Sequence, residues 1–231
     1  MQPANDGQTP LHIAVVSEVP NIVDILAANA AEILEDDEGS TPLDLAINAG
    51  LQDITESLST LAASLPVFKA ATAGDCSGLA TALAAANDAG LDYSIPDASV
   101  SDGNFLHRLA QDGFDSCIAP VMEGLAEDAD REAVIFSTNN LGQLPSDVAA
   151  YYGQTEAFKA ILAVVADSGL VASDIIEHQD NDGRTPFILA AEGGHVDMIN
   201  YLGDEGANVN HVSASVHFSL KAYMGKIWKG L

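Results

Sequence analysis

The residues of this chain that could do chemistry are two cysteines, six histidines and 34 carboxylates. The segment Gly74-Asp75-Cys76-Ser77-Gly78 could present a nucleophile on a turn, which would require a preceding strand, a nearby base and a paired acid. Its flanks predict helices instead, because an alanine-rich segment follows it. We interpret it as a turn between helices. We expect Cys76 and Cys117 to be small buried hydrophobic residues rather than reactive thiols.

Metal sites and catalytic acid pairs are not indicated. The histidines are scattered and lack the spacing of metal ligands. Close carboxylate pairs such as Asp36-Asp37 arise from composition alone, and a catalytic pair also needs a pocket that perturbs its pKa values. The two cysteines form no CxxC pair, so the sequence indicates neither a disulfide framework nor a zinc site. We expect no catalytic residue, no metal and no cofactor, and the cysteine usage favours a reducing, intracellular setting.

A repeated motif predicts the elements that position these side chains. The clearest copies read G-Q-T-P-L-H-I-A at residues 7–14, G-S-T-P-L-D-L-A at 39–46 and G-R-T-P-F-I-L-A at 183–190. Weaker copies read L-P-V-F-K-A at 65–70, F-L-H-R-L-A at 105–110 and L-P-S-D-V-A at 144–149. Glycine permits a tight turn, threonine caps a helix and proline suits the first helical position. Each copy therefore predicts a short helix, which a longer amphipathic helix follows.

These motifs resemble the ankyrin repeat family. The stretch from Asp180 to Val212 follows the 33-residue pattern of the family without a gap, although Ile188 replaces the usual histidine and Gly203 replaces a leucine. The resemblance implies an all-α fold, an ankyrin repeat solenoid of stacked helix-turn-helix units with β-hairpin or loop fingers on one edge. It implies six repeats, the third and fourth degenerate, at about 4–38, 36–64, 65–98, 99–138, 139–176 and 180–212.

The repeat array is expected to cover residues 1–212. Leu51 to Leu65 contains no hairpin signal, so the second and third repeats are predicted to join helix to helix. Insertions at 84–102 and 163–182 predict loops or added helix on one edge of the stack. The degenerate third and fourth repeats suggest a soft joint, because the stability of such arrays comes from contacts between neighbours.

The charge of the chain excludes several classes of function. The net charge is −26 over 231 residues, which argues against binding nucleic acid, whose phosphates require Lys and Arg. No run approaches the ~18 apolar residues that a membrane helix needs. The apolar fraction of 48% is sufficient for a packed core.

The C-terminal tail, residues 213–231, reverses this charge. All 34 acidic residues and five of the eight basic residues lie in residues 1–205, whereas the tail carries Lys221, Lys226 and Lys229. Its apolar residues, Trp228 among them, recur at helical spacing and predict a basic amphipathic tail or capping helix. Three interpretations stay open: a cap on the last repeat, the start of a truncated repeat, or a helix for weak peripheral contact with a membrane or for a partner.

The resemblance implies a non-catalytic protein–protein interaction scaffold or adaptor that binds a partner protein through its concave groove and finger tips. The partner-binding positions that match the family are Asp37, Glu38, Ser40, Asn48, Tyr151, Tyr152, Asn181, Asp182, Arg184 and Glu192. The adjacent tyrosines are notable because Tyr is enriched in binding hot spots. The acidic residues at the tips are either a solvated face or a contact for a partner with a basic surface.

A second functional hypothesis is also consistent with the resemblance. The array could be the targeting region of a larger enzyme, or part of a secreted effector of a host-associated bacterium. A scaffold protein would be cytoplasmic, whereas an effector would be secreted into a host cell. An array that is itself an enzyme has no supporting residues.

Overall fold

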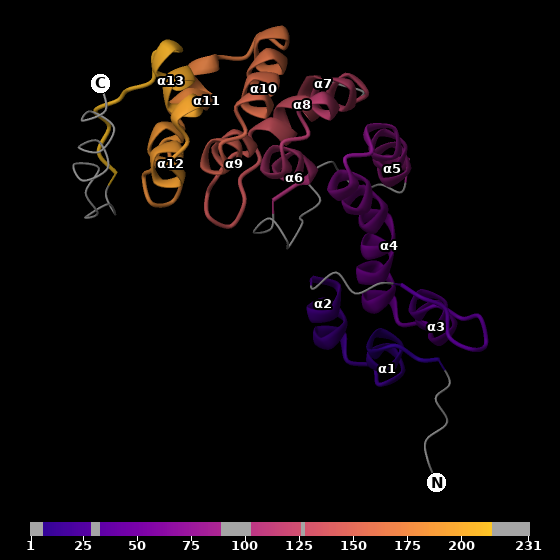
Figure 1. The fold of residues 1–231 in the computed structure, drawn as a ribbon. Coiled ribbons are helices and arrows are strands. Elements are labelled where there is room, and N and C mark those ends of the chain that lie inside the picture. The colour runs from indigo at the N-terminus through magenta and orange to yellow at the C-terminus, as the bar shows by residue number, and fades with distance from the viewer. Residues whose placement is uncertain (1–6, 29–32, 89–102, 126–127, 214–231) are drawn as a thin grey trace.

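The computed structural model describes residues 7–28, 33–88, 103–125 and 128–213 (Figure 1). These residues contain helices but no β-strand, which confirms the predicted all-α class for the described part of the chain. The helices are α1 (Pro10–Val16), α2 (Pro20–Ala28), α3 (Pro42–Ala49), α4 (Gln52–Ala73), α5 (Cys76–Asp88), α6 (Phe105–Asp112), α7 (Asp115–Glu123), α8 (Asp128–Ile135), α9 (Pro145–Tyr152), α10 (Thr155–Asp167), α11 (Ala172–Ile176), α12 (Pro186–Gly193) and α13 (Val196–Asp204).

Helices α1, α3, α6, α9 and α12 begin at the motif copies, and we call them the inner helices. The hydroxyl oxygens of Thr9 and Thr41 accept hydrogen bonds from the backbone N–H groups of the third helical residue, which caps α1 and α3. All inner helices except α1 end at a left-handed glycine. Gly153, with φ of 71°, is one of them, and a Cβ there would collide with the ring of His195. Glycine is therefore required both for the backbone and for the close approach.

The inner helices from α6 onward pack side by side. Helix α9 packs between α6 and α12, and these three helices form one layer (Figure 1). The longer helices α7, α10 and α13 form a second layer, in which α10 contacts both α7 and α13. We call α2, α5, α7, α10 and α13 the outer helices. Phe105 and Phe158 are among the largest fully buried side chains between the layers. Burial of apolar surface between successive pairs is the main stabilising contribution in such a stack.

Two histidines of the motif connect successive repeats. His12 Nε2 lies 2.9 Å from the carbonyl oxygen of Ser40, and His107 Nε2 lies 2.9 Å from that of Gln143. In each case Nδ1 accepts a hydrogen bond from the backbone N–H of the capping residue. Since Nδ1 accepts, Nε2 carries the proton and donates to the next repeat.

Asp147 occupies the same motif position in α9, but its partner differs. Its carboxylate accepts a hydrogen bond from the N–H of Leu144 and lies 2.5 Å from Nδ1 of His178, which follows α11. Asp147 is fully buried, and burial raises the pKa of its carboxyl, while the hydrogen bond and the charge of His178 act in the opposite direction. The pair holds α11 against the start of α9.

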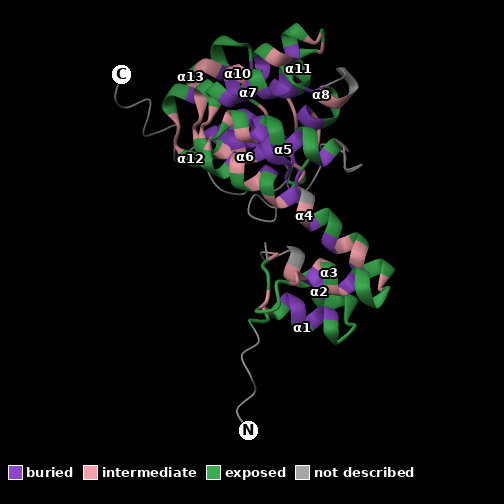
Figure 2. Cartoon of the chain, turned by 90° about the vertical axis from the view of Figure 1, so that its right-hand side faces the viewer, coloured by how far each residue is buried: buried purple, intermediate pink, exposed green. Residues whose placement is uncertain are grey.

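The described residues form two hydrophobic cores. The smaller one lies between α1, α2, α3 and the first half of α4 and includes Leu11, Val23 and Leu58. The larger one begins at Val67 in the second half of α4 and extends to Ala207. Figure 2 shows the two parts, with α4 running between them. Helix α4 therefore joins the second repeat to the third without a loop, and Pro66 lies inside it.

A disulfide bond joins Cys76 to Cys117, so the expectation of no disulfide is wrong. Cys76 is the first residue of α5 and Cys117 lies in α7, and these outer helices pack together. The segment 74–78 is otherwise the predicted turn between helices, with Gly74 left-handed. Disulfides persist in oxidising surroundings, so the inference of a reducing compartment loses its basis.

The structure describes one of the two predicted insertions, but it does not describe most of the other or nearly all of the tail. The insertion at 163–182 contains the short helix α11. Most of the insertion at 84–102 and nearly all of the predicted basic tail lie outside the described residues. None of the described helices is long and apolar enough to cross a membrane.

Candidate functional site

The turns before α3, α9 and α12 share one conformation, and we call residues 36–40, 139–143 and 180–184 the fingers. The Oδ1 atom of Asp36 accepts hydrogen bonds from the N–H groups of Glu38 at 3.0 Å and Ser40 at 2.9 Å. Asp180 Oδ1 binds the N–H groups of Asp182 and Arg184 at 3.0 and 2.9 Å. An aspartate that hydrogen-bonds the backbone in this way fixes the turn. The exposed finger residues are therefore held in a defined geometry.

The last two fingers contact each other. Asn139 forms the same turn by accepting from the N–H groups of Leu141 and Gln143, each at 3.0 Å. Asn181 then donates its backbone N–H to the carbonyl of Leu141 at 3.1 Å and its amide to the carbonyl of Asn140 at 3.3 Å. The fingers of the fifth and sixth repeats thus form one continuous edge.

Arg184 is the centre of an ion-pair network at this edge. Its guanidinium contacts the carboxylates of Asp180 at 2.8 Å, Asp182 at 3.4 Å and Glu192 at 3.3 Å. Partial burial lowers the pKa of Arg184, but the hydrogen bond and the charges of these acids raise it above its usual value. Three carboxylates surround one cation, so the edge stays acidic, and the network joins the finger to the end of α12.

Tyr151 and Tyr152 extend this surface along α9. Their side chains are 42% and 47% exposed, and their rings meet edge to face with centroids 5.2 Å apart. His195 supports the backbone beneath them, since its Nε2 lies 2.9 Å from the carbonyl oxygen of Tyr151. Tyr151 has the same position in α9 as Glu192 in α12, and these helices pack together.

The predicted partner-binding residues fall into two groups. The residues of the fifth and sixth repeats lie on fingers and on inner helices that are built on the larger core. We call this set the distal surface, and it comprises Tyr151, Tyr152, Asn181, Asp182, Arg184 and Glu192. Asp37, Glu38, Ser40 and Asn48 lie on the finger before α3 and on α3 itself, in the part built on the smaller core. The structure brings the first group together, and α4 separates it from the second.

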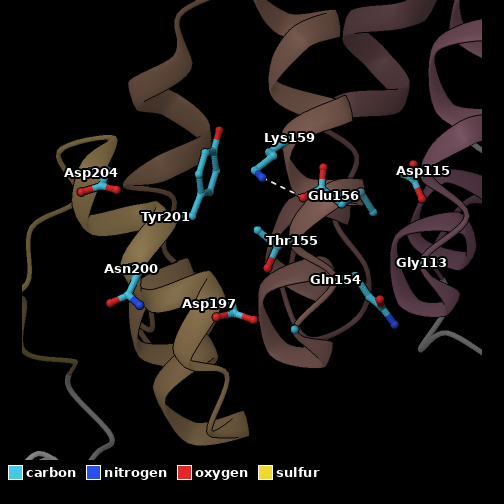
Figure 3. A pocket seen from close by; sticks show the side chains of 12 residues that line it. Gly113, Asp115, Gln154, Thr155, Glu156, Lys159, Asp197, Asn200, Tyr201 and Asp204 are labelled. Carbon is cyan, nitrogen blue, oxygen red and sulfur yellow. Dashed lines mark hydrogen bonds and ion pairs between the residues drawn. The ribbon is translucent and has the colours of Figure 1, made fainter. Parts of the chain in front are cut away.

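A groove lies beside the C-terminal ends of α6 and α9, where its lining includes Gly113 and Gly153 (Figure 3). It has a volume of about 710 Å³ and lies between the beginnings of α7 and α10 and one side of α13, from Asp197 to Asp204. Its acidic lining residues are Asp115, Glu156, Asp197 and Asp204. Lys159 pairs with Glu156 at 2.7 Å and lies 5.2 Å from the ring centroid of Tyr201. Burial, with the charge of Glu205, raises the pKa of Tyr201 to about 12, so the phenol stays protonated.

Lys159 and Tyr201 were not found from the sequence. The turns that begin with Gly153 and Gly194 place the starts of successive outer helices side by side, and this regularity is the signal that could have predicted the groove. The described residues contain no cluster of three His, Cys, Asp or Glu side chains that could hold a metal ion.

Comparison with models of known protein families gives a match. The family model described as ankyrin repeats, in three copies, matches residues 1–67 and 106–213. The segment between these ranges includes α5 and Cys76, which the disulfide joins to the matched part. A search of curated proteins gives no significant match.

Proposed function

Because the chain belongs to the ankyrin repeat family, whose repeats are generally protein–protein interaction modules, we propose that it is a scaffold that binds a partner protein through the distal surface. The proposal includes no catalytic step. The family is typically non-catalytic.

The pair of exposed tyrosines beside the Arg184 network carries this proposal. Tyr151 and Tyr152 present two amphipathic rings from a helix whose other residues are buried, so little conformational entropy is lost when a partner covers them. Hydrogen bonds between neighbouring fingers fix the edge at the other end of α9. Rigid aromatic side chains next to fixed polar groups are typical of binding hot spots.

We propose that the partner contacts this surface with basic residues. Asp182 is exposed, and the three negative charges of Asp180, Asp182 and Glu192 outnumber the single positive charge of Arg184. The chain as a whole has a net charge of −26. Complementary charge speeds association and selects against acidic competitors, and its contribution falls as salt rises.

The test is selection from a displayed random-peptide library on the immobilised full chain at low and high salt. We expect enrichment of peptides that contain Lys or Arg, with binding weakened at least tenfold in the variant Tyr151→Ala/Tyr152→Ala. The matched control is Val171→Ala/Val196→Ala, which removes two side chains of 58% and 50% exposure outside the distal surface. Peptides that bind the tyrosine variant and the control equally well would contradict the proposed site.

A further inference from the structure

Pro66 is the proline of the third motif copy, yet it lies in the middle of α4. Pro42, Pro145 and Pro186 occupy the same motif position and begin α3, α9 and α12. A proline inside a helix removes one backbone hydrogen bond and crowds the preceding turn. Helix α4 is therefore weakest at the boundary between the two cores.

The residue before the proline determines whether the helix is continuous. Thr41 and Leu144, which precede Pro42 and Pro145, are extended, with ψ of 160° and 162°. Leu65 holds the same position but lies within α4. Since a residue before proline prefers the extended region, Leu65 can adopt the conformation of Leu144. That change would bend the chain at Pro66.

The second repeat exposes a face that is covered elsewhere in the stack. Ile47 of α3 is 56% exposed, whereas Ala110 of α6 and Ala150 of α9, at the same position of their helices, are fully buried. Val15 holds this position in α1, where the second repeat covers it and leaves 1% exposed. The position therefore faces the next repeat along the chain, and in α3 that neighbour is displaced because α4 is one continuous helix.

The third repeat has a concave face lined largely by small side chains. A groove of about 800 Å³ lies between the second half of α4 and α5, and its lining includes Pro66, Lys69, Ala70, Ala73, Ala82 and Ala85. Val67 and Ala71, on another side of α4, are buried in the larger core. Small side chains let another helix approach closely, as Ala149 and Ala150 do where α9 packs between its neighbours.

We propose that α4 bends at Pro66 and that the first two repeats of the same chain close onto this α4–α5 groove, with Ile47 against its alanines. The closed arrangement continues the packing that α6, α9 and α12 already show. The fingers of the second repeat then join the row that leads to the distal surface.

The test is small-angle X-ray scattering of the full chain together with its variants. Pro66→Ala restores the helical hydrogen bond and favours a straight α4. Ile47→Asp places a charge in the closed interface. We expect both variants to have a larger radius of gyration than the wild type. Ile13→Asp, at a residue of α1 with 54% exposure, is the matched control and is expected to leave the radius unchanged.

Two outcomes would overturn the proposal. One is a wild-type scattering curve identical to that of Pro66→Ala, which would mean that α4 does not bend. The other is a wild-type molar mass that doubles with concentration, because the groove would then be filled by a second copy rather than by the same chain. Circular dichroism checks that each variant folds. Pro66→Ala introduces no charge, so its result can be interpreted even where Ile47→Asp does not fold.

Discussion

Single side chains connect the repeats, and His107 is the clearest case. It is fully buried, its Nδ1 accepts from the N–H of Asn104, and its Nε2 donates to the carbonyl of Gln143 in the next repeat. Burial lowers the pKa of His107 to about 4, since the charged ring would lose its hydration. The neutral ring is thus the form that stabilises the junction between the fourth and fifth repeats.

The pH dependence of stability follows from this shift. The unfolded chain binds a proton at His107 near pH 6.5, whereas the folded chain does so only near pH 4. The contribution is therefore complete above pH 6.5 and is lost as the pH falls toward 4. We expect His107 to lower the free energy of unfolding by about 2 kcal/mol between pH 7 and pH 5. Urea unfolding at the two pH values measures this change.

The control for this measurement is His107→Gln. Glutamine at the third helical position can still bind the N–H of the capping residue Asn104, but it does not titrate. Between pH 7 and pH 5, the change in its free energy of unfolding should be smaller than the change in the wild type, and the difference should be about 2 kcal/mol. Equal changes in the two proteins would show that His107 is protonated in the folded chain.

At the scale of helices, the local motifs were sufficient to predict most of the fold. Proline and glycine act on residues within one turn, so the starts and ends of α3 and α12 can be predicted from neighbouring residues alone, and the hydroxyl of Thr41 also caps α3. The predicted joining of the second and third repeats through helix agrees with α4. Contacts between distant residues could not be predicted. Cys76 and Cys117 are 41 residues apart, and only the packing of α5 on α7 brings them together.

Only part of the candidate site could be predicted from local sequence. Asn181, Asp182 and Arg184 were predicted from the family resemblance within one motif copy, and their relative positions depend on a local turn. The groove with Lys159 and Tyr201 needs α10 and α13 to lie side by side, which depends on the stacking of whole repeats. The separation of Asn48 from the distal surface depends on α4, whose direction no short motif encodes.

The disulfide is expected to stabilise the pairing of α5 with α7. It closes a loop of 41 residues, and the lost entropy of the unfolded chain corresponds to about 4 kcal/mol. Addition of a reductant should therefore lower the melting temperature of the wild type. Cys76→Ala/Cys117→Ala should melt near the temperature of the reduced wild type and be insensitive to reductant. An unchanged melting temperature on verified reduction would contradict this expectation.

At the scale of the whole molecule, the two cores differ greatly in size. Among the described residues, eight buried residues form the core of the first two repeats and thirty-three form the larger core. Stability in a repeat array is approximately the sum of repeat and neighbour terms, so opening can be local. We expect the first two repeats to open without unfolding of the remainder.

Matched substitutions in the two cores test this independence. Leu58 in α4 and Leu109 in α6 are both fully buried leucines, one in each core. Truncation of either to alanine should cost roughly 3 kcal/mol. In hydrogen-exchange mass spectrometry, Leu58→Ala should speed exchange in residues 10–61 and leave 105–207 unchanged, because the larger core keeps its packing. Leu109→Ala should act on the larger core first. Faster exchange throughout the chain in Leu58→Ala would mean that the cores unfold as one unit and that α4 couples them.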